Sequence, residues 1–180
     1  MLFIVLLSLL SFTALLPAAH SLPQHTSSTS KRGSAHQIRA FLFAHNIIRE
    51  AHNATDLTWS IELAEKAGEW ADGCKFERTE GVLRELPYGE LHVAATGIFP
   101  ISTAISQFAK DAIEYNPAEP TYNHWTQIVW KSTTQVGCAR SHCSNLLGRR
   151  TGLATYYVCL YDPAGNVIGQ ALDNVQVSWL

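Results

Sequence analysis

Apolar residues recur at helical spacing along the early part of the chain. In residues 35–52 they stand three and four positions apart, so this segment is predicted to form an amphipathic helix. Ser60 can cap a second helix, because small and apolar residues follow it three and four positions on and continue along one face to Cys74. Ser102 can cap a third helix, whose apolar face runs to Tyr115. Three helices are therefore expected before the last third of the chain.

The last third has a different pattern, in which β-branched and aromatic residues dominate segments bounded by turns. These predicted strands are residues 135–140, 154–160 and 167–177. The Asp-Pro-Ala-Gly-Asn segment at 162–166 is a predicted turn that joins the last two strands as a hairpin. Residues 75–87 are a predicted loop, and residues 88–93 a further candidate for extended structure. Helices early and strands late predict an α+β fold, a three-layer α/β/α sandwich with a mostly antiparallel central sheet.

The N-terminus carries a long apolar run. Residues 2–16 are interrupted by three hydroxyl side chains alone, and no Asp, Glu, Lys or Arg precedes Lys31. Small residues at Ala19 and Ser21 occupy the positions that signal peptidase recognises, so residues 1–21 are predicted to be a secretory signal peptide. The run is short of the roughly 20 residues that span a bilayer. A secreted, extracellular protein with no membrane span is expected.

Residues 22–34 form a Ser/Thr-rich segment that is predicted to be disordered, since such a composition cannot bury apolar area. Lys31-Arg32 is either a dibasic processing site or a solvated pair in a flexible tail. Residues 35–180 are sufficient for one domain with its own core. Within that domain, Asn53-Ala54-Thr55 is a predicted N-glycosylation site just past the first helix.

Charge and cysteine content narrow the class of protein. The formal net charge of −2 lacks the basic footprint of a nucleic-acid-binding protein. All four cysteines lie in the predicted domain: Cys74, Cys138, Cys143 and Cys159. In an oxidising compartment an even number predicts two disulfides, with three possible pairings. A zinc site competes with this interpretation, but the spacing of Cys138 and Cys143, with distant partners, is poor for a zinc finger.

Four residues are candidates for a polar site: Glu90, His92, Asp111 and His124. Carboxylates and histidines can bind a hard or borderline metal, or transfer protons. None of their local spacings is a metal-binding signature, and surface carboxylates with a hydrogen-bonded histidine are the simpler interpretation. No Gly-x-Ser-x-Gly nucleophile motif occurs, and the cysteines are better used in disulfides. The residue pattern by itself therefore gives no indication of catalytic activity. The aromatic residues and the small-residue helix face are expected to form core, or to leave an apolar groove for a lipid.

Four motifs follow one another along the chain: residues 44–49 with 57–59, residues 88–90, residues 124–130 with 136–139, and residues 157–166. In this order they resemble the CAP superfamily (cysteine-rich secretory proteins, antigen 5 and pathogenesis-related 1) over about residues 36–178, nearest to its fungal secreted branch. The resemblance implies an α/β/α sandwich stabilised by disulfides. It also implies that Cys74 pairs with Cys138 and Cys143 with Cys159.

The resemblance further implies a central cleft with two histidines and two acids, which in some members binds a divalent cation such as zinc. Glu90, Asp111 and His124 match three of these positions and are the candidate metal ligands. Arg78 stands where the other histidine is expected, and an arginine cannot ligate a metal. We expect it to pair with a cleft acid and to replace the cation, so that no cofactor is required. His92 is the alternative donor, because it shares a strand face with Glu90.

Lipid binding is the other activity that the resemblance implies. Sterol-binding members carry an aromatic loop just before the His124 motif; here Tyr115 and Tyr122 are kept, while Pro117 stands where a middle aromatic is expected. Fatty-acid binding between helices would fall near the first helix. The main expectation is a non-enzymatic protein that binds a sterol, a fatty acid or another small hydrophobic ligand, in defence or host interaction. The alternatives are a cation-binding protein or metal-dependent hydrolase, and an interaction module with a vestigial cleft.

Overall fold

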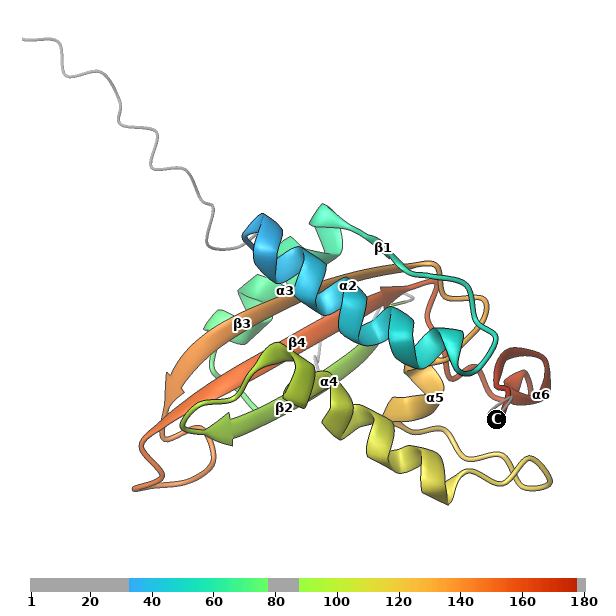
Figure 1. The fold of residues 1–180 in the computed structure, drawn as a ribbon. Coiled ribbons are helices and arrows are strands. Elements are labelled where there is room, and N and C mark those ends of the chain that lie inside the picture. The colour runs from blue at the N-terminus through green and yellow to red at the C-terminus, as the bar shows by residue number, and fades with distance from the viewer. Residues whose placement is uncertain (1–32, 78–87, 178–180) are drawn as a thin grey trace, which may run out of the picture.

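The computed structural model describes residues 33–77 and 88–177. Its elements follow in the order α2 (Ala35–Glu50), β1 (Thr58–Trp59), α3 (Ile61–Asp72), β2 (Gly89–Thr96), α4 (Ile101–Ala109), η1 (Lys110–Glu114), α5 (His124–Ile128), β3 (Gln135–Ser144), β4 (Leu153–Asp162) and α6 (Ala171–Asn174). Figure 1 shows their arrangement. The predicted signal peptide 1–21, the Lys31-Arg32 pair with most of segment 22–34, and Arg78 lie outside the described residues.

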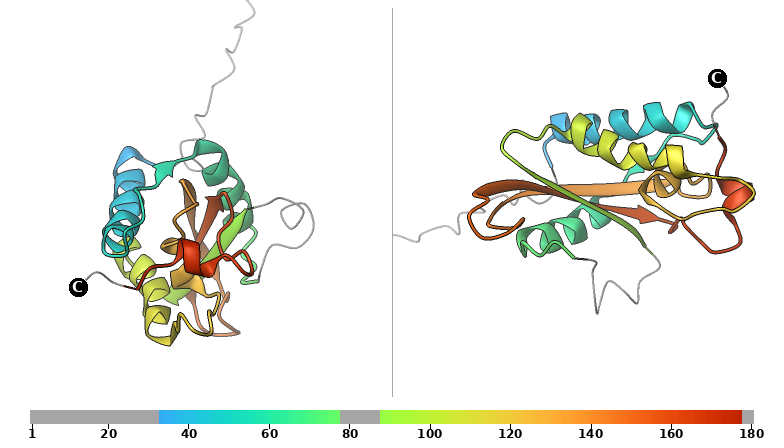
Figure 2. Two further views of the ribbon diagram at one scale, coloured as in Figure 1. Left: turned by 90° about the vertical axis from the view of Figure 1, so that its right-hand side faces the viewer. Right: turned by 90° about the horizontal axis from the view of Figure 1, so that it is seen from below.

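The four strands form one mixed sheet in the order β1-β3-β4-β2. β4 runs antiparallel to both β3 and β2, and the short β1 runs parallel to β3. Helices α2 and α4 cover one face of the sheet and α3 covers the other, as the right-hand view of Figure 2 shows. The predicted three-layer sandwich with a mostly antiparallel sheet is confirmed. Strand β2 lies at an edge of the sheet, which places its outer side next to the cavity described below.

Strand β4 is the centre of two separate cores, because successive side chains of a strand point to opposite faces. Tyr157, Cys159 and Tyr161 pack into the cluster beneath α2, α4 and α5. The alternate residues, Tyr156 and Val158 among them, pack into the smaller cluster beneath α3. Burial on both faces explains why this strand is an almost continuous apolar run.

Of the two predicted helix caps, Ser60 is confirmed and Ser102 is wrong. Ser60 caps α3 by accepting a hydrogen bond from the amide of Leu63, as predicted. Helix α2 ends at Glu50, two residues early, and its 16 residues make it the longest described helix. Helix α4 begins after Pro100 and not after Ser102, because Pro100 is the last residue with extended backbone. No helix in the described ranges has both the length and the apolar character needed to cross a bilayer.

The predicted hairpin after β4 is wrong. β4 ends at Asp162, and the following residues form turns and the short helix α6 in place of a strand at 167–177. Both edges of β4 are already paired, with β3 and with β2, so no edge remains for a third partner. The segment instead covers the chain after α5: Asn174 accepts from the amide of Ser132, and its carbonyl accepts from the amide of Lys131.

All four cysteines form disulfides, but the predicted pairing is wrong. The bonds join Cys74 to Cys143 and Cys138 to Cys159. Cys138 and Cys143 are five residues apart on β3, an odd separation, and therefore face opposite sides of the sheet. Cys138 lies directly opposite Cys159 on β4, whereas Cys143 lies on the α3 side, where Cys74 follows the helix. A bond from Cys74 to Cys138 would have to cross the sheet.

Candidate functional site

A cavity of about 210 Å³ lies beside the edge strand β2. Its lining includes Glu90 and His92 from β2 and His124 from the start of α5, together with Phe76 and Glu77. The fold thus brings together two of the predicted cleft residues, Glu90 and His124, and the alternative donor His92. Asp111 is in contact with His124 and is absent from this lining.

His124 is held in a fixed orientation at the first turn of α5. Asn123 caps this helix through a reciprocal pair of hydrogen bonds with Thr126. The Asp111 carboxylate accepts from His124 Nδ1 at 2.6 Å and from its backbone amide at 3.3 Å, and the imidazole stacks on Phe108. A carboxylate can only accept, so Nδ1 carries the hydrogen and the neutral ring has its lone pair on Nε2. Asp111 therefore orients the histidine and does not itself face the cavity.

His92 is oriented by a second, independent chain of hydrogen bonds. Its Nδ1 lies 2.6 Å from the hydroxyl of Tyr156, which donates to the carbonyl of Lys75. Because the tyrosine proton is used on Lys75, Nδ1 is the donor to Tyr156 and the lone pair of neutral His92 is on Nε2. Burial raises the pKa of Tyr156, which keeps that proton in place.

The Nε2 atom of His92 is buried and has no hydrogen-bond partner within the described ranges. It lies 3.7 Å from Glu90 Oε2, and the two side chains are only 10% and 14% exposed. An acceptor nitrogen beside a carboxylate is unfavourable unless a proton or a cation lies between them. Nε2 of His92 is therefore the unsatisfied polar atom at this cavity among the described residues.

The donors partly fit a divalent cation. Imidazole nitrogen and carboxylate oxygen are zinc ligands, and the 3.7 Å between Glu90 and His92 is near the roughly 3.3 Å expected between two ligands of tetrahedral zinc. The donors of Glu90, His92 and His124 do not all lie within 4.8 Å of one another. In the described residues that spacing is met by His45, Cys138 and Cys159, whose sulfurs form a disulfide. The edge cavity is thus a two-donor half-site that His124 faces.

A larger groove of about 800 Å³ lies between α2 and α4. Its apolar lining comes mainly from Phe43, Ala44, Ile47 and Ile48 on α2 and from Pro100 and Ile101 at the start of α4. Phe43 is 69% exposed, and Ile47 is also exposed, although Phe41 on the other face of α2 is buried in the core. Arg140 and two serines of α4 supply polar groups to the lining. The family resemblance implied a fatty-acid site near the first helix, but the sequence did not show which residues would line it.

The predicted lipid loop between η1 and α5 is fastened to the core at both ends. Tyr115 is buried, with its ring centroid 5.2 Å from that of Trp125. The Tyr122 hydroxyl accepts from the amide of Gly169 at 2.7 Å, while Pro117 is exposed. Both tyrosines therefore anchor the loop, and ligand binding there stays a prediction.

A buried polar network joins α2 to α5 and to the chain that follows α5. The guanidinium of Arg49, fully buried on α2, donates to the carbonyls of Thr55, Ile128, Trp130 and Thr133 at 2.6–2.9 Å. One turn earlier, His45 Nδ1 donates to the carbonyl of Phe41, and Nε2 accepts from the hydroxyl of Tyr161. Ile128 is the last residue of α5, so the Arg49 guanidinium lies at the C-terminal end of that helix, where the helix dipole is negative. The Ala-His-Asn-x-x-Arg motif of α2 is therefore structural.

The predicted glycosylation site is accessible. Asn53 lies exposed just past the end of α2, in left-handed backbone conformation with φ of 53°. Its Nδ2 donates to the Gln176 side chain at 3.2 Å. Attachment of a glycan stays a prediction.

The sequence is similar to a family of known proteins. Residues 42–161 match the model of the CAP family, described as the cysteine-rich secretory protein family. The chain belongs to the CAP family. A probable pathogenesis-related protein of Candida albicans is 40% identical over 139 residues, covering 76% of this chain and 40% of that protein. The secreted protein PRY1 of the same fungus is 37% identical, covering 74% and 31%. The chain thus spans two fifths or less of these relatives' length.

Another relative and two solved structures also match the chain. The fruiting body protein SC14 of Schizophyllum commune is 33% identical over 151 residues, covering 81% of this chain and 68% of that protein. Among solved structures, Na-ASP-1 superposes with a TM-score of 0.61 at 20% identity, covering 80% of this chain and 43% of that one. NaASP2 with Zn²⁺ superposes with a TM-score of 0.59 at 20% identity, covering 82% and 89%. These two likenesses show the shared fold.

Proposed function

We propose that this protein is a secreted, non-enzymatic CAP protein that binds a small hydrophobic ligand in the groove between α2 and α4. The observation that carries this proposal is the groove itself, an apolar hollow of about 800 Å³ on a protein surface. Pockets of this size hold drug-sized ligands and are lined mainly by apolar side chains. The exposed Phe43 and Ile47 in its wall gain burial when a ligand covers them.

The polar groups at the groove favour a particular ligand chemistry. Arg140 is a permanent cation, and a guanidinium binds a carboxylate through paired, charge-assisted hydrogen bonds. Ser102 and Ser106 add hydroxyl groups to the same lining. This set favours a fatty acid over a sterol, which has no charged head group. The loop of Tyr115 and Tyr122 is the alternative sterol site, and it is less favourable because both rings are already packed.

The proposal of secretion rests on the apolar leader at residues 1–21 and on the absence of free cysteines in the described residues. Disulfides persist in oxidising compartments outside the cytosol. Relatives named secreted proteins, such as PRY1 of Candida albicans, support the same compartment.

The groove is tested by loading the protein, collected from the medium of a secreting host, with labelled palmitate and labelled cholesterol. We expect retention of palmitate, reduced at least about tenfold by Ile47→Glu, because an ionised carboxyl then stands in the apolar wall. Ile113→Glu is the matched control, since Ile113 is 90% exposed and lies outside the groove. Equal retention by both variants would place the ligand elsewhere, and no retention above a denatured sample would refute the function.

A second function, binding of a divalent cation at the edge cavity, is favoured by the unpartnered Nε2 of His92 beside Glu90. A bound ion would supply positive charge between these two groups. We expect zinc titrated calorimetrically to bind, and His92→Gln to weaken binding about 10- to 100-fold. His142→Gln, an exposed strand histidine outside the cavity, is the control. Unchanged zinc binding in His92→Gln would exclude this residue as a ligand.

A further inference from the structure

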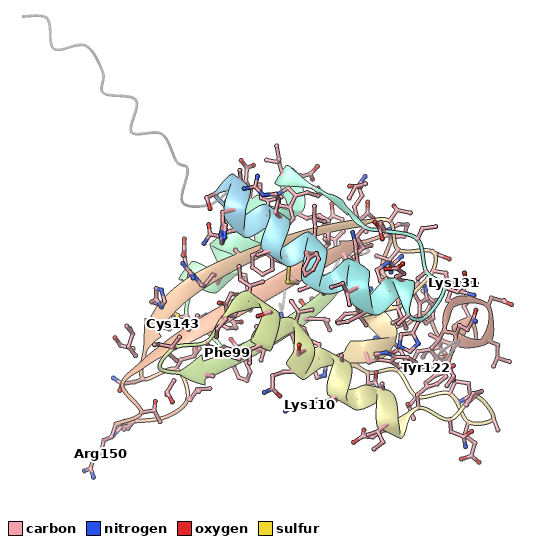
Figure 3. The ribbon with its side chains drawn as sticks, in the orientation of Figure 1. Phe99, Lys110, Tyr122, Lys131, Cys143 and Arg150 are labelled. Carbon is pink, nitrogen blue, oxygen red and sulfur yellow. A yellow bond between two sulfur atoms is a disulfide. The ribbon has the colours of Figure 1, made fainter. Side chains whose placement is uncertain are left out.

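One end of the molecule combines exposed aliphatic side chains with unpaired arginines. The hairpin that joins β3 to β4 ends in Leu147, Arg149, Arg150 and Leu153, all exposed. Ile98, in the loop from β2 to α4, is 98% exposed, and Leu153 is 58% exposed. We call these five residues the end surface. Figure 3 shows Arg150 at the tip of the hairpin, with Tyr122 towards the opposite end of the molecule.

The β2–α4 loop and the hairpin lie together. Thr96, the last residue of β2, pairs with Ala154 in the register of the sheet. The carbonyl of Gly97 then accepts from the hydroxyl of Thr155 at 3.4 Å. Ile98 follows at once, so it emerges beside Leu153. The aliphatic part of the end surface therefore comes from two elements that the sheet holds in register.

The charge of this end is opposite to that of the chain as a whole. Residues 140–155 contain three arginines and no Asp or Glu, whereas the chain has a net charge of −2. The carboxylate that touches the hairpin, Asp72, accepts from Ser141 near the middle of β3. Arg149 and Arg150 form no ion pair with any residue of the described ranges. Both guanidinium groups are thus available to an external anion.

We propose that the end surface docks on an anionic phospholipid bilayer. Exposed aliphatic side chains beside basic ones match the boundary between acyl chains and head groups, where the first insert and the second pair with phosphate. A soluble polyanion would be attracted by the arginines alone and would leave Ile98, Leu147 and Leu153 in water. The aliphatic side chains therefore favour the bilayer.

Docking in this way would bring the groove close to a source of lipid, a consequence that rests on the proposed function. Pro100 and Ile101, which line the groove, follow Ile98 by two and three residues. Arg140, also in the lining, belongs to the β3 strand of the same hairpin. The same two elements thus form the end surface and one part of the groove wall. A bilayer bound at the end surface would lie next to the groove, from which a single-chain lipid could enter.

The test is co-sedimentation of the secreted protein with vesicles of phosphatidylcholine alone and of phosphatidylcholine with phosphatidylserine. We expect binding to the anionic vesicles, weakened about 30-fold by Arg149→Gln with Arg150→Gln, since each basic residue near such a surface contributes about tenfold or less. Ile98→Ser with Leu153→Ser should weaken binding roughly tenfold by removing the inserted side chains.

Matched controls exist on other surfaces. Arg39→Gln with Lys110→Gln removes two exposed cations, and Ile113→Ser with Ile168→Ser removes two aliphatic side chains of similar exposure. The controls should bind vesicles like the wild type. Equal binding to both vesicle types, or an equal loss in the controls, would overturn the proposal. Loss in the arginine variant alone, with Ile98→Ser and Leu153→Ser bound like the wild type, would also overturn it, because the proposed docking requires the aliphatic side chains to insert.

The two proposals fail separately. Palmitate retention in solution needs no vesicle, so the end-surface variants should keep it while they lose vesicle binding. Ile47→Glu should show the reverse. If the wild type retains palmitate and does not bind vesicles, membrane docking is refuted and the groove proposal stands. If the wild type binds vesicles through the end surface and does not retain palmitate, the groove proposal is refuted and membrane docking stands.

Discussion

His45 in the core and His92 at the sheet edge are both held through Nδ1, and they differ at the other ring nitrogen. In the core, Nε2 of His45 accepts a hydrogen bond from Tyr161 at 2.8 Å. At the edge, Nε2 of His92 has no such partner in the described part of the chain and lies 3.7 Å from a carboxylate. A buried polar group that is fully satisfied contributes to the fold, whereas one left unpaired is available for a ligand.

The contrast extends to the neighbouring charges. Arg49 satisfies its buried charge with four carbonyl groups, one from the loop after α2 and three from residues 128–133. Asp111 and His124 form a pair at the edge whose side chains are partly exposed to solvent. The core network should therefore control stability, and the edge pairs should control binding.

The largest effect is expected at Arg49. Arg49→Met keeps much of the aliphatic volume and removes every donor to the four carbonyls, so it should lower the free energy of unfolding by about 3–5 kcal/mol. Urea denaturation followed by tryptophan fluorescence measures this loss. A loss below about 1 kcal/mol would mean that the network contributes little to stability.

The next effect is the pH dependence contributed by His45. Burial lowers the pKa of His45 to about 4, against about 6.5 in an unfolded chain. Between these values the unfolded state binds more protons than the folded state, so stability should fall as the pH drops from 6.5 to 4, by about 3 kcal/mol at most. Unfolding of His45→Gln over the same range should show a smaller slope. An identical slope would assign the acid sensitivity to other groups.

A matched pair of tyrosines makes the comparison sharper. Tyr161→Phe leaves His45 Nε2 buried and unpaired, and should cost about 1–3 kcal/mol of stability. Tyr156→Phe should cost about 1 kcal/mol or less, because its partner His92 lies beside a cavity that water can enter. Thermal unfolding of the two variants side by side gives the ranking. The reverse ranking would contradict the division into core and edge.

The smallest effect is expected at Asp111. Asp111→Asn keeps the shape and removes the charge of a partly exposed pair, so stability should change by less than about 1 kcal/mol. Chemical denaturation measures the change, with wild type as reference. A loss above about 2 kcal/mol would show that this pair contributes to the fold as the core network does.

Features set by local spacing were predictable, and features set by the faces of the sheet were not. Ser60 and the helix that it caps follow from a short pattern, and the cleft pair of Glu90 and His124 follows from motifs that resemble the CAP family. The disulfide pairing requires knowledge of which face of β3 each cysteine occupies. The expected strand at 167–177 failed because the strand order leaves β4 no free edge, which no local pattern reveals.

The sites illustrate the same limit. His92 could be proposed as an alternative donor because residues two apart on a strand share a face, but its orientation by Tyr156 joins residues 64 positions apart. The groove combines residues of α2 and α4 with Arg140 of β3. Its members are separated along the chain, and the exposed face of α2 resembles an ordinary amphipathic surface until α4 is placed beside it.

The central claim is that the groove between α2 and α4 holds a fatty acid, and photoaffinity labelling tests it most directly. A palmitate analogue with a diazirine in its chain is irradiated with the secreted protein, and the crosslinked peptides are identified by mass spectrometry. We predict labels on residues 40–48 and 100–106, competed by unlabelled palmitate and lost in Ile47→Glu. Labels confined to residues 115–122, or labels that unlabelled palmitate does not displace, would contradict the claim.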